Sequence, residues 1–502
     1  MTTREQRSRV IPGHYAQKVA RSPKCPGRKL GARRVEDQPS VGMSPEESSA
    51  DLGIEAASTG IVGRIKEALP EGTFAVGAGL IVAAITAYLF VIVTLNALDA
   101  KEKSGFSAFW ALVFVAGVGF FLPIEQEVSR AIAARRAQGL GAGPLVKRAA
   151  GLAFGLLVLL LVTITSVELL GNHIISDEFF HGNQVLVWAL ELSLVGFFCM
   201  HLTRGVLSGN GRFRPYGEMM GAEGIFRLAG AIVLAIIGVK VAGLFGLCLA
   251  VSPFLAVAIA MRFQRGLLTD GPPAPYSELS TALGWLLMGS VFMQVLGYTP
   301  LLGVSLLSTG DPEKDIAIRA SFASAFFIAR IPVLLFQAVQ GTLLPKLAGL
   351  AGAGKSQDFR DGLMRLLAVV TGIAVLGTLA GFTVGPIAGR ILFKDFDMSS
   401  LNLGLLAAGS GAFIIALTIA QALIALNAYA RVAFSWVAGV VGFAVVCSLI
   451  TDIFLRVELG FLAGAVVACA LMLLQLQRVM HTGLAISAQS LLEAIEHEPL
   501  EL

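Results

Sequence analysis

An almost unbroken series of apolar segments runs from Phe74 to Met480. The chain of 502 residues is 55% hydrophobic and only 14% charged, and its mean hydropathy is +0.76. No water-soluble core of this size needs so much apolar surface, whereas a helix that crosses a bilayer needs about 20 apolar residues in a row. The sequence therefore predicts an all-α polytopic membrane protein.

The same length criterion predicts about twelve membrane-spanning helices. Their approximate bounds are 74–98, 108–124, 149–170, 184–206, 218–238, 242–261, 280–306, 317–341, 363–388, 402–426, 431–451 and 459–477. We expect two six-helix bundles over 71–270 and 271–480, with a cytoplasmic C-terminal tail over 481–502. GxxxG pairs of the kind that pack membrane helices occur at Gly151/Gly155, Gly377/Gly381 and Gly460/Gly464.

The distribution of lysine and arginine among the loops predicts the orientation. If the N-terminus is cytoplasmic, the inside loops, Arg204 included, hold fifteen such residues against eight in the outside loops. Basic residues accumulate on the cytoplasmic side of a membrane protein. Both termini of this multi-pass protein of the cytoplasmic membrane are therefore predicted to be cytoplasmic.

The N-terminal tail, residues 1–70, differs in composition from the rest of the chain. Residues 1–34 carry ten Arg or Lys against one Glu, and residues 36–55 contain six acidic residues. Such polar sequence cannot bury enough apolar area to fold, so the tail is expected to be disordered. Two questions stay open: whether Met43 is the true start, and whether the basic run touches anionic headgroups. A short interfacial helix is expected at Ile61–Leu69.

A weak internal repeat supports the two-bundle prediction. Ile124–Gly143 aligns without gaps on Leu335–Gly354, at an offset of 211 residues, or about six spans. Repeats that run in the same direction after an even number of spans imply a pseudo-two-fold axis along the membrane normal.

Two arginines, Arg227 and Arg330, fall near the middle of predicted spans, one in each half of the chain. A guanidinium at bilayer depth costs at least about 2.5 kcal/mol, so such a residue marks a candidate functional site. Arginine binds phosphate oxygens bidentately and keeps its charge. We therefore predict an aqueous cavity between the bundles that holds an anionic group. Glu223 lies four residues before Arg227, and the sequence does not distinguish a structural pair from a cavity-lining one.

Other polar residues within the spans are weaker candidates. Glu191, Gln294, Tyr298 and His201 could line the cavity or serve a coupling ion. For Glu168, by contrast, the favoured interpretation is a structural carboxylate near an interface. Prolines at positions 123, 253, 300, 332 and 386 could kink their spans.

The sequence predicts no metal, cofactor or catalytic residue. The cysteines are scattered and form no CxxC or Cys/His cluster. Gly349–Ser356 matches GxxxxGK[ST], but the expected strand and nucleotide-binding domain are missing around it. Nucleotide binding is therefore not expected.

Two segments resemble the polysaccharide-type lipid flippases of the multidrug/oligosaccharidyl-lipid/polysaccharide exporter superfamily. The run Ala329-Arg330-Ile331-Pro332, continued by Leu343-Leu344-Pro345-Lys346-Leu347, is similar to the eighth span of that family. Thr203–Phe213 is similar to the end of its fourth span. The resemblance implies two bundles around a cavity that moves lipid-linked sugars across the bilayer. It also implies that Arg330 faces the diphosphate. The basic residues that peptidoglycan-precursor relatives carry in the first span have no counterpart within 74–98.

The leading hypothesis is therefore a non-enzymatic flippase for a lipid-linked, polyprenyl diphosphate oligosaccharide, working by alternating access. A cation-coupled multidrug antiporter and a transport-dead scaffold for cell-wall assembly remain alternatives. A membrane glycosyltransferase is disfavoured because the loops are short. The expected partners are the lipid-linked glycan and membrane lipids, with no nucleic acid. We expect a monomer, and leave association with glycan-assembly enzymes open.

Overall fold

A computed structural model describes residues 73–279, 282–307, 309–333, 336, 356–394 and 396–497, with side chains up to about Met480. The predicted tail over 1–70, the helix expected at Ile61–Leu69 and most of the second copy of the repeat lie outside these residues.

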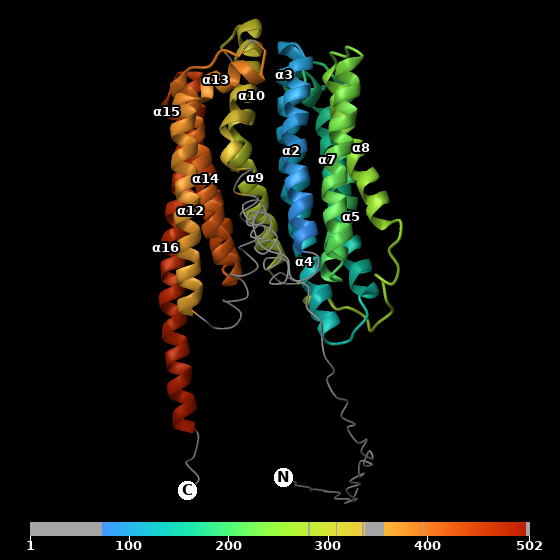
Figure 1. Cartoon of the computed structure of the whole chain (residues 1–502), viewed down its shortest axis with the longest axis vertical. Helices are drawn as coiled ribbons and strands as arrows, with labels where there is room; N and C mark the ends of the chain where they lie inside the picture. Colours follow the sequence, from blue (N-terminus) through green and yellow to red (C-terminus); the bar gives the residue numbers. More distant parts are fainter. Residues whose placement is uncertain are drawn as a thin grey trace, which may run out of the picture. The chain divides into compact units, whose positions relative to one another are not determined.

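Helices, and no strands, make up the regular structure of the described part of the chain, and twelve of its helical segments are long and apolar enough to cross a membrane. This confirms the predicted fold class. The first six spans are formed by α2 (Thr73–Ala97), α3 to α4 (Ala100–Ala137), α5 (Gly143–Leu170), α6 (Gln184–Gly209), α7 (Phe213–Ile236) and α8 (Ala242–Met261). The second six are formed by α9 (Leu283–Leu306), α10 (Pro312–Ala329), α12 (Ser356–Thr383), α14 (Ser400–Ala425), α15 (Tyr429–Leu449) and α16 (Ile453–His497). The short α13 (Gly385–Leu392) follows α12 (Figure 1).

The helix boundaries follow from capping residues and prolines. Asp99 accepts a hydrogen bond from the Glu102 amide at 3.0 Å, and Asp311 accepts from Glu313 and Lys314 at the start of α10. Such caps satisfy amides that have no partner within the helix. Pro386 was expected to kink the ninth span, but it lies in the first turn of α13, where its missing N–H is not needed.

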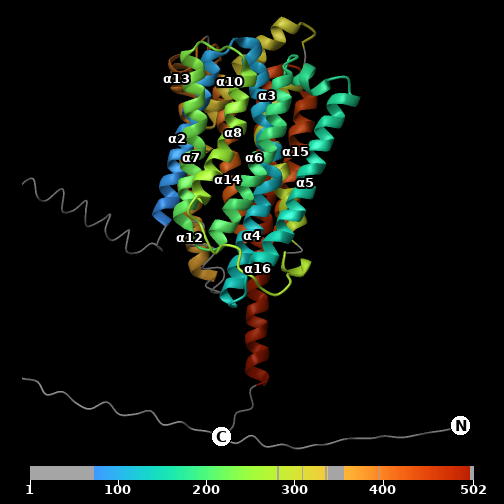
Figure 2. The ribbon, with the colours of Figure 1, turned by 90° about the vertical axis from the view of Figure 1, so that its right-hand side faces the viewer.

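Each half of the chain packs its helices in the same pattern. In the first bundle α2 packs on α7, while α8 packs on both α6 and α7. The corresponding second-half contacts are α9 on α15, and α16 on both α14 and α15. In Figures 1 and 2 the helices of both halves run roughly side by side along the long axis. The repeated pairing agrees with the predicted pseudo-two-fold relation between the bundles.

The second span is longer and less regular than its predicted bounds of 108–124. The chain is helical from Ala100 to Ala137, and a π-helical turn, η1 (Phe114–Val118), separates α3 from α4. A π-turn leaves backbone carbonyls without their usual partner and occurs often at functional sites. Here the Phe114 carbonyl accepts a hydrogen bond from Gln294 of α9 at 3.2 Å.

Specific contacts join the two bundles along α2. The Tyr88 hydroxyl donates to the Phe327 carbonyl of α10 at 2.7 Å. Near the end of α2, the Asn96 side chain donates to the Leu392 carbonyl at 2.7 Å and accepts from the Lys394 amide at 2.8 Å. These bonds connect positions about 240 to 300 residues apart, so they fix how the bundles meet.

Candidate functional site

A cavity lies between the two bundles. It encloses about 810 Å³, solvent-open space included, and is lined from the first bundle by α2, α3, η1 and α7. From the second bundle it is lined by α9, α10 and the residues after α10. Its aromatic wall consists of Tyr88, Trp110, Phe114, Tyr298, Phe326 and Phe327. Among the described lining residues, Arg330 is the only one that carries a charge.

Arg330 reaches this cavity because α10 ends immediately before it. The helix is interrupted at Arg330, which takes the capping position of α10 with φ −92° and ψ 0°, and residues 331–333 are helical again. Pro332 follows two residues later and has no N–H with which to continue the helical ladder. The end of the helix thus falls within the eighth span and presents a guanidinium to the space between the bundles.

Within the part of the chain that the structure describes, the surroundings of the Arg330 guanidinium leave its charge uncompensated. Its Nη1 donates to the Gly297 carbonyl at 2.5 Å, and its Cζ lies 4.7 Å from the Tyr298 ring and 5.0 Å from the Phe326 ring. Aromatic faces attract a cation but supply no counter-charge. Within the described residues no carboxylate pairs with Arg330. An anionic ligand would supply the missing counter-charge.

Arg227 has a different environment, and it does not line the cavity. Its Nη1 lies 2.9 Å from Oε1 of Glu223, and its side chain is 5% exposed. Its Cζ also lies 5.3 Å from the Phe90 ring and 5.8 Å from the Trp110 ring. Ser252 of α8 donates to Glu223 at 3.2 Å.

Of the two arginines expected to share one aqueous cavity, Arg330 is among the described residues that line it, and Arg227 is not. Glu223 lies one helical turn before Arg227 and neutralises it inside the first bundle. Trp110 contacts Arg227 and also lines the cavity. The structure thus places the Glu223–Arg227 pair behind the aromatic wall, and Arg330 is the arginine that faces the space.

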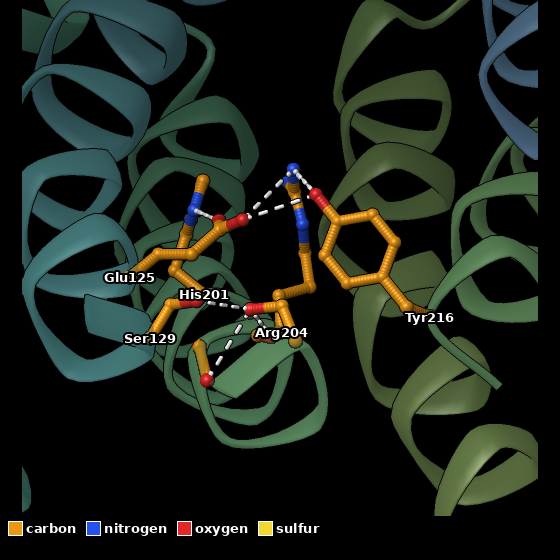
Figure 3. A network of polar contacts seen from close by, with 7 residues as sticks. Glu125, Ser129, His201, Arg204 and Tyr216 are labelled. Atoms are coloured by element: carbon orange, nitrogen blue, oxygen red, sulfur yellow. Dashed lines mark hydrogen bonds and ion pairs between the residues drawn. The ribbon is translucent and has the colours of Figure 1, made fainter. Parts of the chain in front are cut away.

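A second polar cluster is buried in the first bundle (Figure 3). Oε2 of Glu125 in α4 lies 2.7 Å from Nδ1 of His201, and its Oε1 lies 3.2 Å from Nη2 of Arg204. The Tyr216 hydroxyl of α7 donates to Glu125 at 3.1 Å and accepts from Arg204 at 2.8 Å. The cluster therefore ties three helices together. His201 is 2% exposed, and its Nε2 has no partner among the described residues.

This Glu125 cluster was not predicted, because Glu125 lies just beyond the predicted span 108–124 and Arg204 near the end of the predicted span 184–206. Arg204 was counted among the inside-loop charges, yet it lies within α6 with its side chain 12% exposed. Its burial is possible because Glu125 compensates its charge. The available signal was the opposite charge of these two residues, which lie near the ends of the second and fourth predicted spans.

The remaining candidates are placed as follows. Tyr298 lines the Arg330 cavity, and Gln294 joins α9 to η1. Glu191 accepts from Thr165 of α5 at 2.6 Å and does not line the cavity. Glu168 is buried and accepts from the Ser176 hydroxyl at 2.6 Å and from two backbone amides, which is a structural role.

A smaller space of about 470 Å³ also lies between the bundles, where α4 meets α9, α14 and α15. It is lined by Gln126, Ser290 and Gln421 together with apolar residues. The described residues contain no group of three or more His, Cys, Asp or Glu side chains that could hold a metal ion.

Comparison with known sequences gives relatives without a described function. No protein-family model matches the chain. An uncharacterized protein of Mycobacterium tuberculosis is 26% identical over 444 residues, covering 85% of this chain and 97% of the relative. A second uncharacterized protein of that organism is 26% identical over 441 residues, covering 85% of this chain and 95% of the relative.

Comparison with solved structures shows the fold. A multidrug resistance MATE family transporter of the MOP superfamily in an inward-facing conformation matches with a TM-score of 0.61 at 14% identity, covering 80% of this chain and 95% of that chain. An outward-facing conformation of such a transporter matches with a TM-score of 0.61 at 13% identity. The match covers 82% of this chain and 96% of that chain. A third match is a MOP superfamily transporter from Pyrococcus furiosus, which is described as having a binding pocket of reverse polarity. Its TM-score is 0.60 at 14% identity, and the match covers 82% of this chain and 95% of that chain.

These matches establish that the chain has the fold of MATE transporters of the MOP superfamily and is a multi-pass membrane protein. At 13 to 14% sequence identity, these matches show the fold and do not assign a substrate. The inward-facing and outward-facing structures match equally well by TM-score, so the score does not assign a conformational state to this structure.

Proposed function

We propose that this protein exports a lipid-linked oligosaccharide, carried on a polyprenyl diphosphate, across the cytoplasmic membrane. The substrate headgroup enters the cavity between the bundles from the cytoplasm, and the bundles then reorient so that the cavity opens on the other side. The lipid tail stays in the bilayer. The transporter fold supports membrane transport, and the sequence resemblance supports this substrate class.

The observation that carries the proposal is the uncompensated charge of Arg330 in the cavity. A diphosphate is the most anionic part of a lipid-linked sugar, and guanidinium–phosphate hydrogen bonds are charge-assisted and bidentate. Aromatic residues surround Arg330 in the cavity wall, and a less polar environment strengthens such an interaction. By contrast, a cationic drug in the same cavity would be repelled by Arg330.

A proton- or cation-coupled multidrug antiporter is the second candidate. Glu125, His201 and Glu223 are largely buried titratable side chains of the first bundle, although its first span, α2, contains no charged residue. A coupled exporter requires such groups. The fold is shared by MATE transporters and therefore fits this candidate equally well.

Substitution of Arg330 tests the two functions against each other. Arg330→Ala should lower export of surface glycan about tenfold or more, since hydrogen bonds to charged groups contribute about 1.5–3 kcal/mol. Arg330→Lys should lower export less, because it keeps the charge but loses the bidentate geometry. Export is measured in a deletion strain that expresses each variant at a matched level.

The matched control is Arg390→Ala, which removes an exposed arginine of α13. It should leave export unchanged. Full export by Arg330→Ala would remove Arg330 from the mechanism. Drug sensitivity of the deletion strain without a glycan defect would favour the multidrug candidate.

A further inference from the structure

The segment that joins the two bundles, residues 262–279, contacts the first bundle at several points from Leu267 onward. The Gly143 amide at the start of α5 donates to the Thr269 carbonyl at 2.9 Å, and the Asn210 side chain donates to the Leu267 carbonyl at 3.5 Å. A Cβ added to Gly141 would lie 2.0 Å from the Asp270 carbonyl oxygen, so only glycine permits this approach. We call this segment the docked linker.

Arg135, at the end of α4, anchors the docked linker. Its side chain is 3% exposed. Nε and Nη2 bind the two carboxylate oxygens of Glu278 at 2.6 and 3.0 Å, and Nη1 donates to the Pro272 carbonyl at 3.1 Å. The hydrogen bond from Arg135 holds the pKa of the Glu278 carboxyl below its ordinary value. The pair therefore stays ionised and bidentate at neutral pH.

Other contacts extend the attachment. Arg130 donates to the Glu278 carbonyl at 2.9 Å, and the Arg148 guanidinium lies 4.2 Å from the centre of the Tyr276 ring. Leu267, Ala274 and Leu279 are 6%, 3% and 6% exposed and belong to a hydrophobic core that includes residues of both bundles. The polar contacts of Arg130, Arg135 and Arg148 are therefore what fix the linker to the first bundle.

We propose that the docked linker moves with the first bundle as one rigid part during transport, so that the bundles are joined only by the chain from Leu279 to Leu283. This rests on the alternating-access function proposed above. Four residue steps span at most about 14 Å, whereas a free chain from Met261 to Leu283 would span up to about 75 Å. The docked linker therefore limits how far the bundles separate where α4 meets α9, and the cavity opens mainly at other edges.

Cross-linking tests this inference on the full-length protein in proteoliposomes. Ala142→Cys and Thr269→Cys are placed in a background without the native cysteines and joined by a short bismaleimide. The Ala142 amide lies 3.4 Å from Oγ1 of Thr269, so the pair is within reach. The readout is translocation of a fluorescent short-chain polyprenyl diphosphate. Cross-linked protein should transport within about twofold of the same protein treated with N-ethylmaleimide. Loss of transport on cross-linking alone would overturn the proposal.

A second linker pair and an inter-bundle pair complete the design. Asn210→Cys with Leu267→Cys repeats the test at an independent contact, in case the first pair does not fold. The inter-bundle pair is Leu80→Cys with Val333→Cys, two positions that line the same cavity from opposite bundles. A cross-link between these two cysteines should abolish transport. If that cross-link leaves transport intact, alternating access fails, and the inference fails with it. If only the linker cross-links block transport, alternating access stands and the docked linker must detach.

Discussion

Arg227 and Arg330 are the same residue type within similar apolar patterns, yet their neighbours assign them different roles. The residue four positions before Arg227 is Glu223, which pairs with it inside the first bundle. The residue four positions before Arg330 is Phe326, whose ring supports the guanidinium but does not neutralise it. The i−4 residue was visible in the sequence, but only the structure shows that Glu223 pairs with Arg227 away from the residues that line the cavity.

Glu125 is the residue on which the second polar cluster depends. Glu125→Gln would leave Arg204 buried without its counter-charge and His201 without its carboxylate. Removing one partner of a buried ion pair costs about 3–5 kcal/mol. We expect a clear fall in the melting temperature of the purified protein in detergent, measured by tryptophan fluorescence.

The control for Glu125→Gln is Glu218→Gln. Glu218 pairs with Arg214 at 3.0 Å on the surface, where its side chain is 45% exposed. An exposed pair on one helix contributes only about 0.3–0.5 kcal/mol, so its loss should hardly change the melting temperature. Equal effects of the two variants would show that the Glu125 cluster does not hold the first bundle together.

At the level of the helices, hydropathy predicted the membrane spans well. The GxxxG pattern predicted the glycines at helix contacts only in part. Gly381 and Gly464 make the close contacts expected of GxxxG pairs, with added Cβ atoms at 2.7 Å from Ala407 and 2.5 Å from Gly439. Gly151 and Gly155, by contrast, have nothing within 4 Å. A GxxxG pattern records spacing on one helix and says nothing of which face meets a partner.

Helices α2 and α7 approach each other closely through two glycines. A Cβ on Gly217 would lie 2.2 Å from the Ala75 carbonyl oxygen, and a Cβ on Gly79 would lie 2.2 Å from the Gly217 carbonyl oxygen. Gly217→Ala should therefore force the helices apart and destabilise the protein by about 1–3 kcal/mol, as overpacking does. The melting temperature in detergent measures this effect.

Gly155→Ala is the matched control because its Cβ meets open space on an exposed side of α5. Replacing glycine by alanine within a helix removes a penalty of about 1 kcal/mol, so this variant should be neutral or slightly stabilising. If both variants are stabilising, the backbone contact between α2 and α7 is looser than described.

On the scale of the whole molecule, the sequence predicts two bundles but not the surface on which they meet. Hydropathy and the repeat depend on local patterns, and these are enough for twelve spans. The cavity wall depends on pairs such as Tyr88 with Phe327 and Trp110 with Phe327, which are over 200 residues apart in the chain. The irregular turn at Phe114–Val118 has no clear sequence signal either, although it supplies part of that wall.

The bonds of Asn96 close the end of the bundle interface that is predicted to face outward. Its side chain holds the Leu392 carbonyl and the Lys394 amide of the opposite bundle at 2.7 and 2.8 Å. Each such hydrogen bond contributes about 1 kcal/mol. Asn96→Ala should therefore shift the equilibrium towards opening at this end by a factor of about 5 to 30, which corresponds to one or two kcal/mol.

Reactivity of a cavity cysteine measures this shift. Ala87→Cys, introduced on the cavity side of α2, is labelled with a membrane-impermeant maleimide added from the outside. Labelling should be about 5 to 30 times faster when Asn96→Ala is also present, since opening precedes reaction. Ser448→Ala is the control, because its hydroxyl bonds only to Val445 within α15. Unchanged labelling with Asn96→Ala would mean that other contacts, such as those of Tyr88 and the aromatic wall, keep this end closed without Asn96.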